Sequence, residues 1–468
     1  MTQRSRSSVW RRHSLPERDY YDEAYEDSGE PRPHYRAALE ALDEHDLARL
    51  GEQLRARALE REVRYGATGP DKFVIDAVPR MFTAQEWDVL DRGLAQRVRA
   101  LDAFLRDAYG ERRIVEAGVV PARLIEDGAF YEPDMQGVDV PVWVGFAGLD
   151  VVRGADGGFH VLEDNVRMPT GLGFAPLAWE AVGDLLDGAL PERSPAPGES
   201  DERFAAILRS AAPDGGGDPS IVVLGDGFEN DAQWEISDVA FRLGVPMVTL
   251  DDLRRREGRV YAHVDGRRRE VHVIYRRSNY HLLRDEDGTP SALAEKLLEP
   301  IRRGTVTVVN PPGVGIADDK LAHVYVEEMI RFYLGEEPVI APARSYDLAD
   351  DDAREAALGR LGELVVKVRD RVGGEGVLIG EEAEEAREDI EERPLDYIAQ
   401  ELVELSRHPT LFDGALAPRR IDLRPLIASG ASGDATVLGG LTRVALGEDS
   451  KVVNMARGGG VKATWTAR

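Results

Sequence analysis

Apolar residues recur at intervals of three and four positions along two early stretches of the chain, 35–63 and 83–110. This period matches one face of an α-helix, so both stretches are predicted to be helices within a helical region over 34–117. Thr83 and Glu86 stand three residues apart at the start of the second stretch, the spacing of a capping box at a helix N-terminus.

The pattern then changes to extended segments. Apolar residues dominate 138–153, and a second extended segment follows at 159–165 after an Asp-Gly turn, which predicts a strand hairpin. A stretch rich in Pro, Gly and Ser at 190–201 is typical of a linker.

The remainder of the chain predicts an α/β unit followed by more helices and strands. Segment 220–227 is predicted as a strand, 230–244 as a helix that ends in glycine, and 245–250 as a second strand. Hairpin strands are predicted over 254–278. Helices are then predicted at 291–303, 319–334 and 381–392, strands at 363–368 and 377–380, and a glycine loop at 373–376, before the closing strands.

Composition narrows the classes of function. The 468 residues include 43% hydrophobic and 31% charged residues, as in a soluble globular protein. The net charge of -27 repels nucleic acid and anionic membranes, unless a local basic groove overrides the mean. The absence of cysteine excludes thiol nucleophiles, disulfides and thiolate zinc sites. Residues 1–33 contain an Arg pair but no apolar segment, so we predict a disordered tail rather than an export signal, and a cytoplasmic protein.

The Asp156-Gly157 turn brings two carboxylates together. A two-residue turn, the type that Asp-Gly favours, places Asp150 directly opposite Glu163, with Asn165 on the same face. Opposed like charges about 4.5–5.5 Å apart destabilise a hairpin unless a divalent cation lies between them. Carboxylate and amide oxygens are ligands that Mg²⁺ prefers. The alternative is a solvated hairpin whose acids point into water.

A lysine interrupts the apolar strand "LVVKV". Only six of the 59 basic residues are lysines, and Lys367 would lose solvation there unless it has a partner. The glycine loop that follows, 373–376, would let backbone N–H groups approach a phosphate. It leads into a strand and not a helix, which excludes a Walker-type arrangement; an ordinary hairpin remains the alternative. Lys320, at a predicted helix start, is a second candidate phosphate ligand or else a surface lysine.

The segment "RRIDLRPLI" places Arg420, Asp422 and Arg424 on one strand face. Arginine forks suit a γ-phosphate or a carboxylate, whereas a cross-strand ladder of ion pairs is an equal alternative. The segment "YIAQELVEL" would suit an adenine-binding edge, although nothing in its residue types requires one. The histidines are scattered and lack the spacing of a metal site.

Six motifs in this order resemble the circularly permuted ATP-grasp family, related to the glutathionylspermidine synthetase ligase domain. They are "GLDVVRGADGGFHVLEDNVRMPTG", "GIADDKLAHVYVEEMIRFYLGEEP", "LVVKVRDRVGGEGVLIG", "YIAQELVELSRHPT", "RRIDLRPLI" and "GGLTRVALGEDSKVVN…GGGVKATW". The likeness runs from about residue 60 to the end of the chain.

The resemblance implies an α/β (α+β) fold, a circularly permuted ATP-grasp with a Rossmann-like module and a helical N-terminal region. We therefore expect, after the tail at 1–33, helices and metal-binding strands over 34–195, the Rossmann-like module over 203–310, and the nucleotide-binding lobe with closing strands over 311–468.

The resemblance also implies the site. Asp150, Glu163 and Asn165 would hold Mg²⁺, and Lys320 and Lys367 would bind ATP phosphates. The lid over the phosphates would include Gly373, Gly374 and Gly376, and adenine would face Gln400, Glu401 and Val403. Arg424, with Arg167 and Lys367, would act on the transferring phosphoryl group. The acceptor would contact Thr170, Arg276, Arg277 and Ser278.

The implied activity is that of an ATP- and Mg²⁺-dependent ligase. It would join a small-molecule or peptide carboxylate to an amine through an acylphosphate. This chain has "VGGEG" where the family usually has "SGGYG", and "RGGGVKATW" for "QGGGSKDTW", so its substrate contacts differ. A phosphotransferase, or a nucleotide-binding protein with little catalysis that acts through a partner, are the alternatives.

Overall fold

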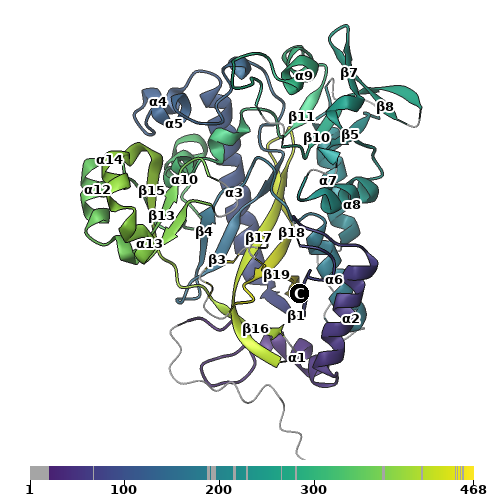
Figure 1. Ribbon diagram of the computed structural model, residues 1–468, viewed down its shortest axis with the longest axis vertical. Helices are drawn as coiled ribbons and strands as arrows, with labels where there is room; N and C mark the ends of the chain where they lie inside the picture. Colours follow the sequence, from purple (N-terminus) through teal and green to yellow (C-terminus); the bar gives the residue numbers. More distant parts are fainter. Residues whose placement is uncertain are drawn as a thin grey trace, which may run out of the picture.

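The computed structural model describes residues 20–66, 68–186, 190, 197–213, 218–227, 230–264, 266–279, 282–371, 375–412, 415–447, 450, 452–453, 455 and 458–467. These residues form helices and four β-sheets, which confirms the mixed α/β class (Figure 1). No helix among them is long and apolar enough to span a membrane.

The central sheet joins the beginning and the end of the chain. Its strand order is β1-β19-β18-β17-β3-β4, with β2 and β16 also paired to β17. β1 and β19 run parallel, whereas β17 is antiparallel to each of its neighbours. The strands are β1 (Ile75–Thr83), β2 (Phe146–Gly148), β3 (Asp150–Arg153), β4 (Phe159–Glu163), β16 (Arg407–Phe412), β17 (Ala415–Ser429), β18 (Ala435–Val444) and β19 (Gly460–Ala467).

The prediction of a helical region over 34–117 is wrong at β1. Helices α1 (Arg36–Asp43), α2 (Leu47–Glu60) and α3 (Ala84–Ala108) are present, and Thr83 and Glu86 form the predicted capping box. Between α2 and α3, however, β1 is buried on both faces and pairs with β19. A strand buried on both faces lacks the alternating pattern by which a half-buried strand is recognised.

The predicted tail is also too long. Residues 1–19 lie outside the described residues, but residues 20–33 pack against the body of the protein. Glu23 is buried between Arg80, 2.6 Å away, and Arg153, 3.5 Å away. Burial alone would raise the pKa of Glu23, but the two arginines lower it to about 2. The paired charge ties this segment to β1 and β3.

The second sheet is wholly parallel, with the order β11-β10-β5-β6 expected of a Rossmann-like module. A small antiparallel sheet, β7-β8-β9, accounts for most of the predicted hairpin strands, whereas β10 leaves it to join the parallel sheet. The strands of these two sheets are β5 (Ile221–Leu224), β6 (Met247–Val248), β7 (Leu253–Arg256), β8 (Arg259–Val264), β9 (Arg267–Val271), β10 (Val273–Arg276) and β11 (Thr307–Val309), with the helices α7 (Pro197–Ser210), α8 (Gln233–Leu243) and α9 (Ala292–Arg302). Helix α6 (Phe174–Leu185) packs against β1, β18 and β19 of the central sheet.

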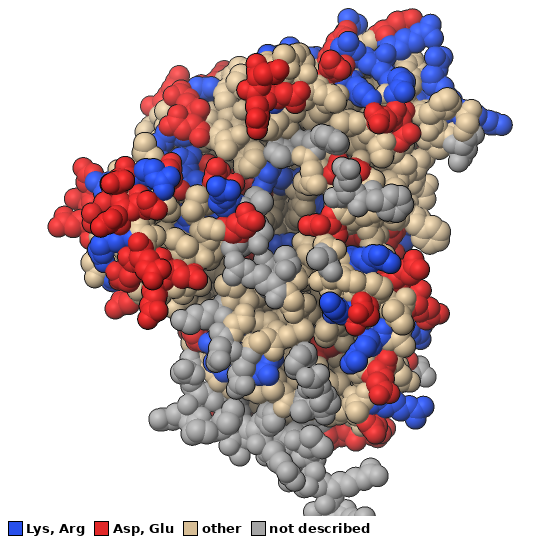
Figure 2. Space-filling model, viewed as in Figure 1, with Lys and Arg blue, Asp and Glu red and all other residues tan. Residues whose placement is uncertain are grey.

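The fourth sheet, β12-β15-β13-β14, forms a lobe with its own apolar core beside the central sheet (Figure 1). Acidic side chains cover its helices, while arginines gather at the opposite upper corner over β7 and β8 (Figure 2). The lobe contains β12 (Ser345–Asp347), α12 (Asp351–Leu358), β13 (Leu364–Val368), β14 (Val377–Ile379), α13 (Glu381–Glu385), α14 (Arg387–Glu392) and β15 (Tyr397–Glu401). The predicted helix at 319–334 is divided into α10 (Lys320–Val324), α11 (Val326–Met329) and a π-helix, Ile330–Leu334.

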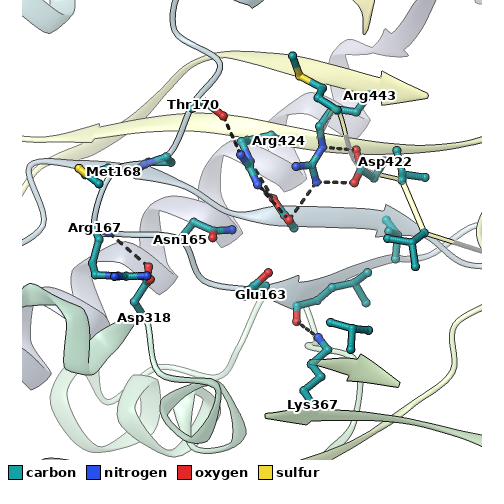
Figure 3. A pocket seen from close by; sticks show the side chains of 18 of the residues that line it. Glu163, Asn165, Arg167, Met168, Thr170, Asp318, Lys367, Asp422, Arg424 and Arg443 are labelled. Carbon is teal, nitrogen blue, oxygen red and sulfur yellow. Dashed lines mark hydrogen bonds and ion pairs between the residues drawn. The ribbon is translucent and has the colours of Figure 1, made fainter. Parts of the chain in front are cut away.

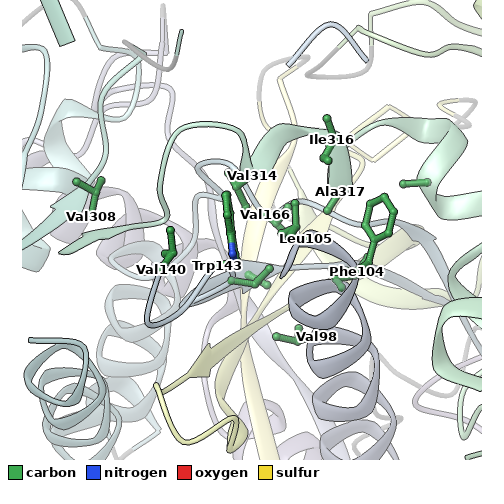
Figure 4. Close-up of a cluster of buried hydrophobic side chains, with 14 of the residues drawn as sticks. Val98, Phe104, Leu105, Val140, Trp143, Val166, Val308, Val314, Ile316 and Ala317 are labelled. Carbon is green, nitrogen blue, oxygen red and sulfur yellow. The ribbon is translucent and has the colours of Figure 1, made fainter. Parts of the chain in front are cut away.

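The largest core fixes these parts around α3. Val98, Phe104 and Leu105 of α3 belong to one buried cluster with Trp143 before β2 and Val308 of the parallel sheet (Figure 4). Because close-packed cores deform little, this cluster gives the strands of the central sheet a rigid support.

Candidate active site

A cavity of about 670 Å³ lies between the central sheet, the parallel module and the acidic lobe. Figure 3 shows part of the lining, with Arg167 directed at Asp318 and Arg443 at Asp422. Most of the residues predicted for the site line the cavity. They are Asp150, Glu163, Asn165, Arg167, Thr170, Arg277, Lys367, Gln400, Glu401, Val403 and Arg424.

The hairpin places Asp150 opposite Glu163, as predicted, although its loop length and strand register differ from the prediction. The loop contains three residues and not two, because Gly154 N–H donates to the carbonyl of Gly158. That change shifts the pairing of Val151 to Val161. An irregularity at Leu162 then restores the pairing of Asp150 with Glu163. The two carboxylates therefore share one end of the hairpin because of two irregularities that offset each other.

Arginines hold Asp150 from two strands. Arg424 donates from Nε over 2.9 Å and from Nη2 over 3.1 Å, and Arg443 approaches to 2.9 Å. Burial alone would raise the pKa of Asp150, but these two charges lower it. Arg443 also bonds Asp422, its neighbour across β17 and β18. The cross-strand ladder considered from the sequence is thus present, and it forms one wall of the cavity.

Lysines approach the other carboxylate. Lys320 Nζ lies 3.0 Å from Glu163, and Lys367 Nζ donates to the carbonyl of Leu162 over 3.0 Å. Lys367 is 6% exposed. Burial lowers its pKa to about 8, aided by the charge of Lys320 and opposed by that of Glu163.

Asn165 and its neighbour Asp164 point in opposite directions. Nδ2 of Asn165 is buried and has no hydrogen-bond partner among the described residues, so its amide is available to the cavity. Asp164 instead bonds Arg97 at 2.5 and 2.7 Å and His323 at 2.8 Å, which places it in the scaffold. Two carboxylates and an amide fit a Mg²⁺ site by their oxygen chemistry. No group of three His, Cys, Asp or Glu side chains in the described part could hold a metal.

Arg167 and Thr170 follow β4 into the same cavity. Arg167 donates to Asp318 over 2.7 Å and lies over the ring of Phe130. Thr170 Oγ1 accepts a bond of 3.1 Å from Arg424 (Figure 3). Both side chains are therefore held in place beside the charged residues of the cavity.

The lining also contains polar residues of β15 and a larger set of apolar residues. Gln400 is locked by its bond of 3.0 Å to Ser345, and Glu401 accepts a bond of 2.5 Å from Tyr346. Val403 lines the space itself. The surrounding apolar lining consists of Val152, Leu162, Val365, Val377, Ile379, Leu402, Leu405, Val452, Val453 and Met455.

Several predicted residues lie elsewhere. Gly373 and Gly374 are outside the described residues, and Gly376 is described but not part of the described cavity lining. Lys320 is also outside that lining; it is buried and donates to the carbonyl of Arg371 beside Glu163. Arg276 and Ser278 are also outside that lining: Arg276 donates to the carbonyl of Asn310 over 2.9 Å, and Ser278 donates to Asp226. Of the "YRRS" segment, Arg277 is the described residue that reaches the cavity.

The sequence interpretation missed Arg443 and Asp318. Arg443 interrupts the apolar "LTRVAL" as Lys367 interrupts "LVVKV", and that signal could have identified it. Asp318 carries no local signal, because its role depends on the loop before α10 meeting the segment after β4.

Comparisons with known proteins identify the family of this chain. Residues 79–445 match the model of the family "Circularly permuted ATP-grasp type 2". A relative from Frankia alni, named "Putative glutamate--cysteine ligase 2-3", is 39% identical over 96% of this chain and 54% of its own length. An uncharacterized Mycobacterium tuberculosis protein is 35% identical over 95% of this chain and 83% of its own.

Two further matches bear on length and fold. A Synechocystis protein is 34% identical over 96% of this chain and 97% of its own, whereas the chain spans about half the length of the Frankia relatives. The structure of a glutathione synthetase-like effector from Globodera pallida superposes with a TM-score of 0.59 at 12% identity, over 90% of this chain and 98% of that one. The chain belongs to the circularly permuted ATP-grasp type 2 family, and the predicted fold is confirmed.

Proposed function

We propose that this chain is an ATP- and Mg²⁺-dependent carboxylate–amine ligase. The observation that carries the proposal is the pair of carboxylates Asp150 and Glu163, which stand opposite each other in the cavity lining. Three cationic side chains of the same lining, Lys367, Arg424 and Arg443, surround them, and Lys320 lies behind, 3.0 Å from Glu163. Family membership and the name of the Frankia relatives support a ligase that acts on amino acids or peptides.

The nucleotide would span the cavity. Its base would lie against the apolar lining beside Val403, and its phosphates would extend toward Lys320 and Lys367. Asp150, Glu163 and Asn165 would hold Mg²⁺, which neutralises phosphate charge when bound. Cations positioned before the reaction stabilise the charge that develops on the transferring phosphoryl group at little further reorganisation cost.

The reaction has two steps. A substrate carboxylate oxygen attacks the γ-phosphorus, and ADP leaves with the electrons of the broken P–O bond. An amine then attacks the carbonyl carbon of the acylphosphate, a proton is lost from nitrogen, and phosphate leaves as the amide forms. Arg424 and Arg167 would stabilise the phosphoryl oxygens, and Thr170 and Arg277 would contact the acceptor. The protein needs no covalent nucleophile, in agreement with a chain without cysteine.

The decisive experiment measures phosphate release from ATP·Mg²⁺ with pooled amino acids, peptides and polyamines, followed by mass spectrometry of the product. Glu163→Gln should lower release at least about 100-fold with an unchanged circular dichroism spectrum, since it removes a charge from the metal set. Glu385→Gln, on α13 of the acidic lobe, is the matched control and should have no effect. Undiminished phosphate release by Glu163→Gln would contradict the assignment of Glu163 as a Mg²⁺ ligand.

The alternatives give different results. Hydroxylamine traps an acylphosphate as a hydroxamate, whereas a phosphotransferase would yield a stable phosphorylated product. Calorimetric binding of ATP·Mg²⁺ without turnover in any pool would indicate a nucleotide-binding protein that acts through a partner.

A further inference from the structure

Glu235 is a buried carboxylate that lies outside the described lining of the cavity, yet it holds the loop after β4. It belongs to α8 and is 1% exposed. Its Oε1 accepts hydrogen bonds from the backbone N–H groups of Gly171, over 2.6 Å, and Gly173, over 3.1 Å. One carboxylate oxygen therefore fixes two positions of the loop 168–173.

The loop has little room to move away from this contact. Gly171 has a φ of +133°, and a Cβ atom there would lie 3.0 Å from Leu426 Cδ2 of β17. A Cβ on Gly173 would lie 3.0 Å from Glu235 Cγ. The loop is thus enclosed between α8 on one side and the central sheet on the other.

Arg277 holds the same loop from the acceptor side. Its Nη1 donates to the carbonyl of Pro169 over 2.5 Å, and its Nη2 lies 3.7 Å from Oε2 of Glu235. That second oxygen is buried and has no hydrogen-bond partner among the described residues. A buried carboxylate oxygen without a hydrogen bond is unfavourable, so the nearby guanidinium charge stabilises it.

The loop then reaches the phosphate end of the cavity through Thr170. Thr170 Oγ1 accepts from Nη1 of Arg424, and Arg424 donates twice more to Asp150 (Figure 3). A continuous set of contacts thus runs from α8 through the loop to the arginine predicted to meet the γ-phosphate.

We propose that Glu235 is a positioning residue that keeps Arg424 aligned while a substrate carboxylate engages Arg277. Such a carboxylate would compete with Pro169 for the guanidinium. Glu235 would then hold the N–H groups of Gly171 and Gly173, while Arg242, also on α8, holds the carbonyl of Leu172 over 2.6 Å. The proposal rests on the proposed function for the identity of this anion. It predicts a loss in kcat rather than in ATP binding, because small displacements of a catalytic group slow the chemical step by up to about 100-fold.

The test compares Glu235→Ala and Glu235→Gln with Glu132→Ala. Glu132 is also a buried carboxylate that accepts a backbone N–H, from Leu283 over 2.9 Å, but it is not part of the described cavity lining. Glu235→Ala should lower kcat for phosphate release about 30- to 100-fold with the KM for ATP changed by less than about twofold. Glu235→Gln retains an acceptor oxygen and should recover most of kcat, and Glu132→Ala should leave kcat unchanged.

Two further measurements separate positioning from general stability. Hydrogen exchange of the free protein should increase at residues 168–173 in Glu235→Ala and not in Glu132→Ala. In a Thr170→Val background, Glu235→Ala should lower kcat by less than about threefold more, because both changes act on one path.

The opposite outcomes overturn the proposal. Unchanged hydrogen exchange at residues 168–173 in Glu235→Ala would show that Glu235 does not hold the loop. If the losses of kcat caused by Glu235→Ala and Thr170→Val multiplied, Glu235 would not act through Arg424. Failure of the proposed function looks different, because the wild-type protein itself would then release no phosphate from ATP·Mg²⁺ with any pool of acids and amines. That result would also withdraw the catalytic role assigned to Glu235.

Discussion

Lys367 and Lys462 are both buried lysines in otherwise apolar strands, but the structure gives them different surroundings. Lys462 on β19 is 0% exposed; it bonds the carboxylate of Asp76 on β1 and the carbonyl of Pro409 over 3.1 Å. Lys367 on β13 faces the cavity and donates to the carbonyl of Leu162. The charge of Glu163 acts on Lys367, but Glu163 is itself paired with Lys320 over 3.0 Å.

The different surroundings separate a lysine that stabilises the fold, Lys462, from one that could bind a ligand, Lys367. Burial lowers the pKa of Lys462 and raises that of Asp76, and each charge opposes the shift of the other. Asp76 also accepts the N–H groups of Val78 and Leu411, so the pair ties β1, β16 and β19 together. Lys367 has a carbonyl and an open cavity before it. A lysine within an apolar strand therefore indicates a binding site only when its protein partners leave it able to meet a ligand.

The largest effect is expected at the structural lysine. Lys462→Met would leave Asp76 buried without its counter-charge, and removal of one partner of a buried pair costs about 3–5 kcal/mol. Urea denaturation monitored by circular dichroism should show this loss in the free energy of unfolding. Adding Asp76→Asn to Lys462→Met removes the unpaired charge and should recover part of the stability. A loss below about 1 kcal/mol would show that the pair contributes little.

Lys367→Met should have the reverse profile. Loss of a charged hydrogen-bond donor to phosphate should weaken ATP·Mg²⁺ binding by up to about 100-fold in calorimetry. The free energy of unfolding should stay constant or rise, because the cost of burying an ammonium group is removed. If Lys367→Met and Lys462→Met destabilised the protein equally, the distinction between the two lysines would fail.

The same comparison predicts a pH dependence. The pKa of Lys367 is about 8, below its ordinary value of 10.5. Between these values the native protein binds fewer protons here than the unfolded chain, so this group's contribution to stability rises with pH. ATP affinity should instead fall by up to about tenfold for each pH unit above 8, because phosphate prefers the charged amine. The decline measured by calorimetry should be absent in Lys367→Met; an identical decline in that variant would assign it to another group.

The two lysines also show how far the sequence leads. "LVVKV" and "GGGVKATW" offer the same local signal, and only the pairing of β1 with β19 reveals that Lys462 has a partner. That pairing joins opposite ends of the chain, so no local pattern indicates it. The Asp150–Glu163 pair agrees with the prediction because a three-residue loop and an irregularity at Leu162 offset each other, and neither feature was predicted. Arg443 and Asp318 reach the cavity through contacts between distant segments, which turn chemistry and periodicity do not specify.

The smallest effect is expected at Glu132, a buried carboxylate whose described contacts lie away from the cavity. Burial raises its pKa to about 7 from 4.5, and its carboxylate accepts the N–H of Leu283. Between these values the native protein binds more protons here than the unfolded chain, so the contribution to stability falls as pH rises and is lowest above pH 7. Glu132→Gln should therefore raise the free energy of unfolding by about 1 kcal/mol at pH 8, discounted for screening, and by almost nothing at pH 4. Equal effects at both pH values would mean that Glu132 acts through packing. Unchanged ATP binding in Glu132→Gln would show that burial of a charge, without a cavity in front of it, does not mark a site.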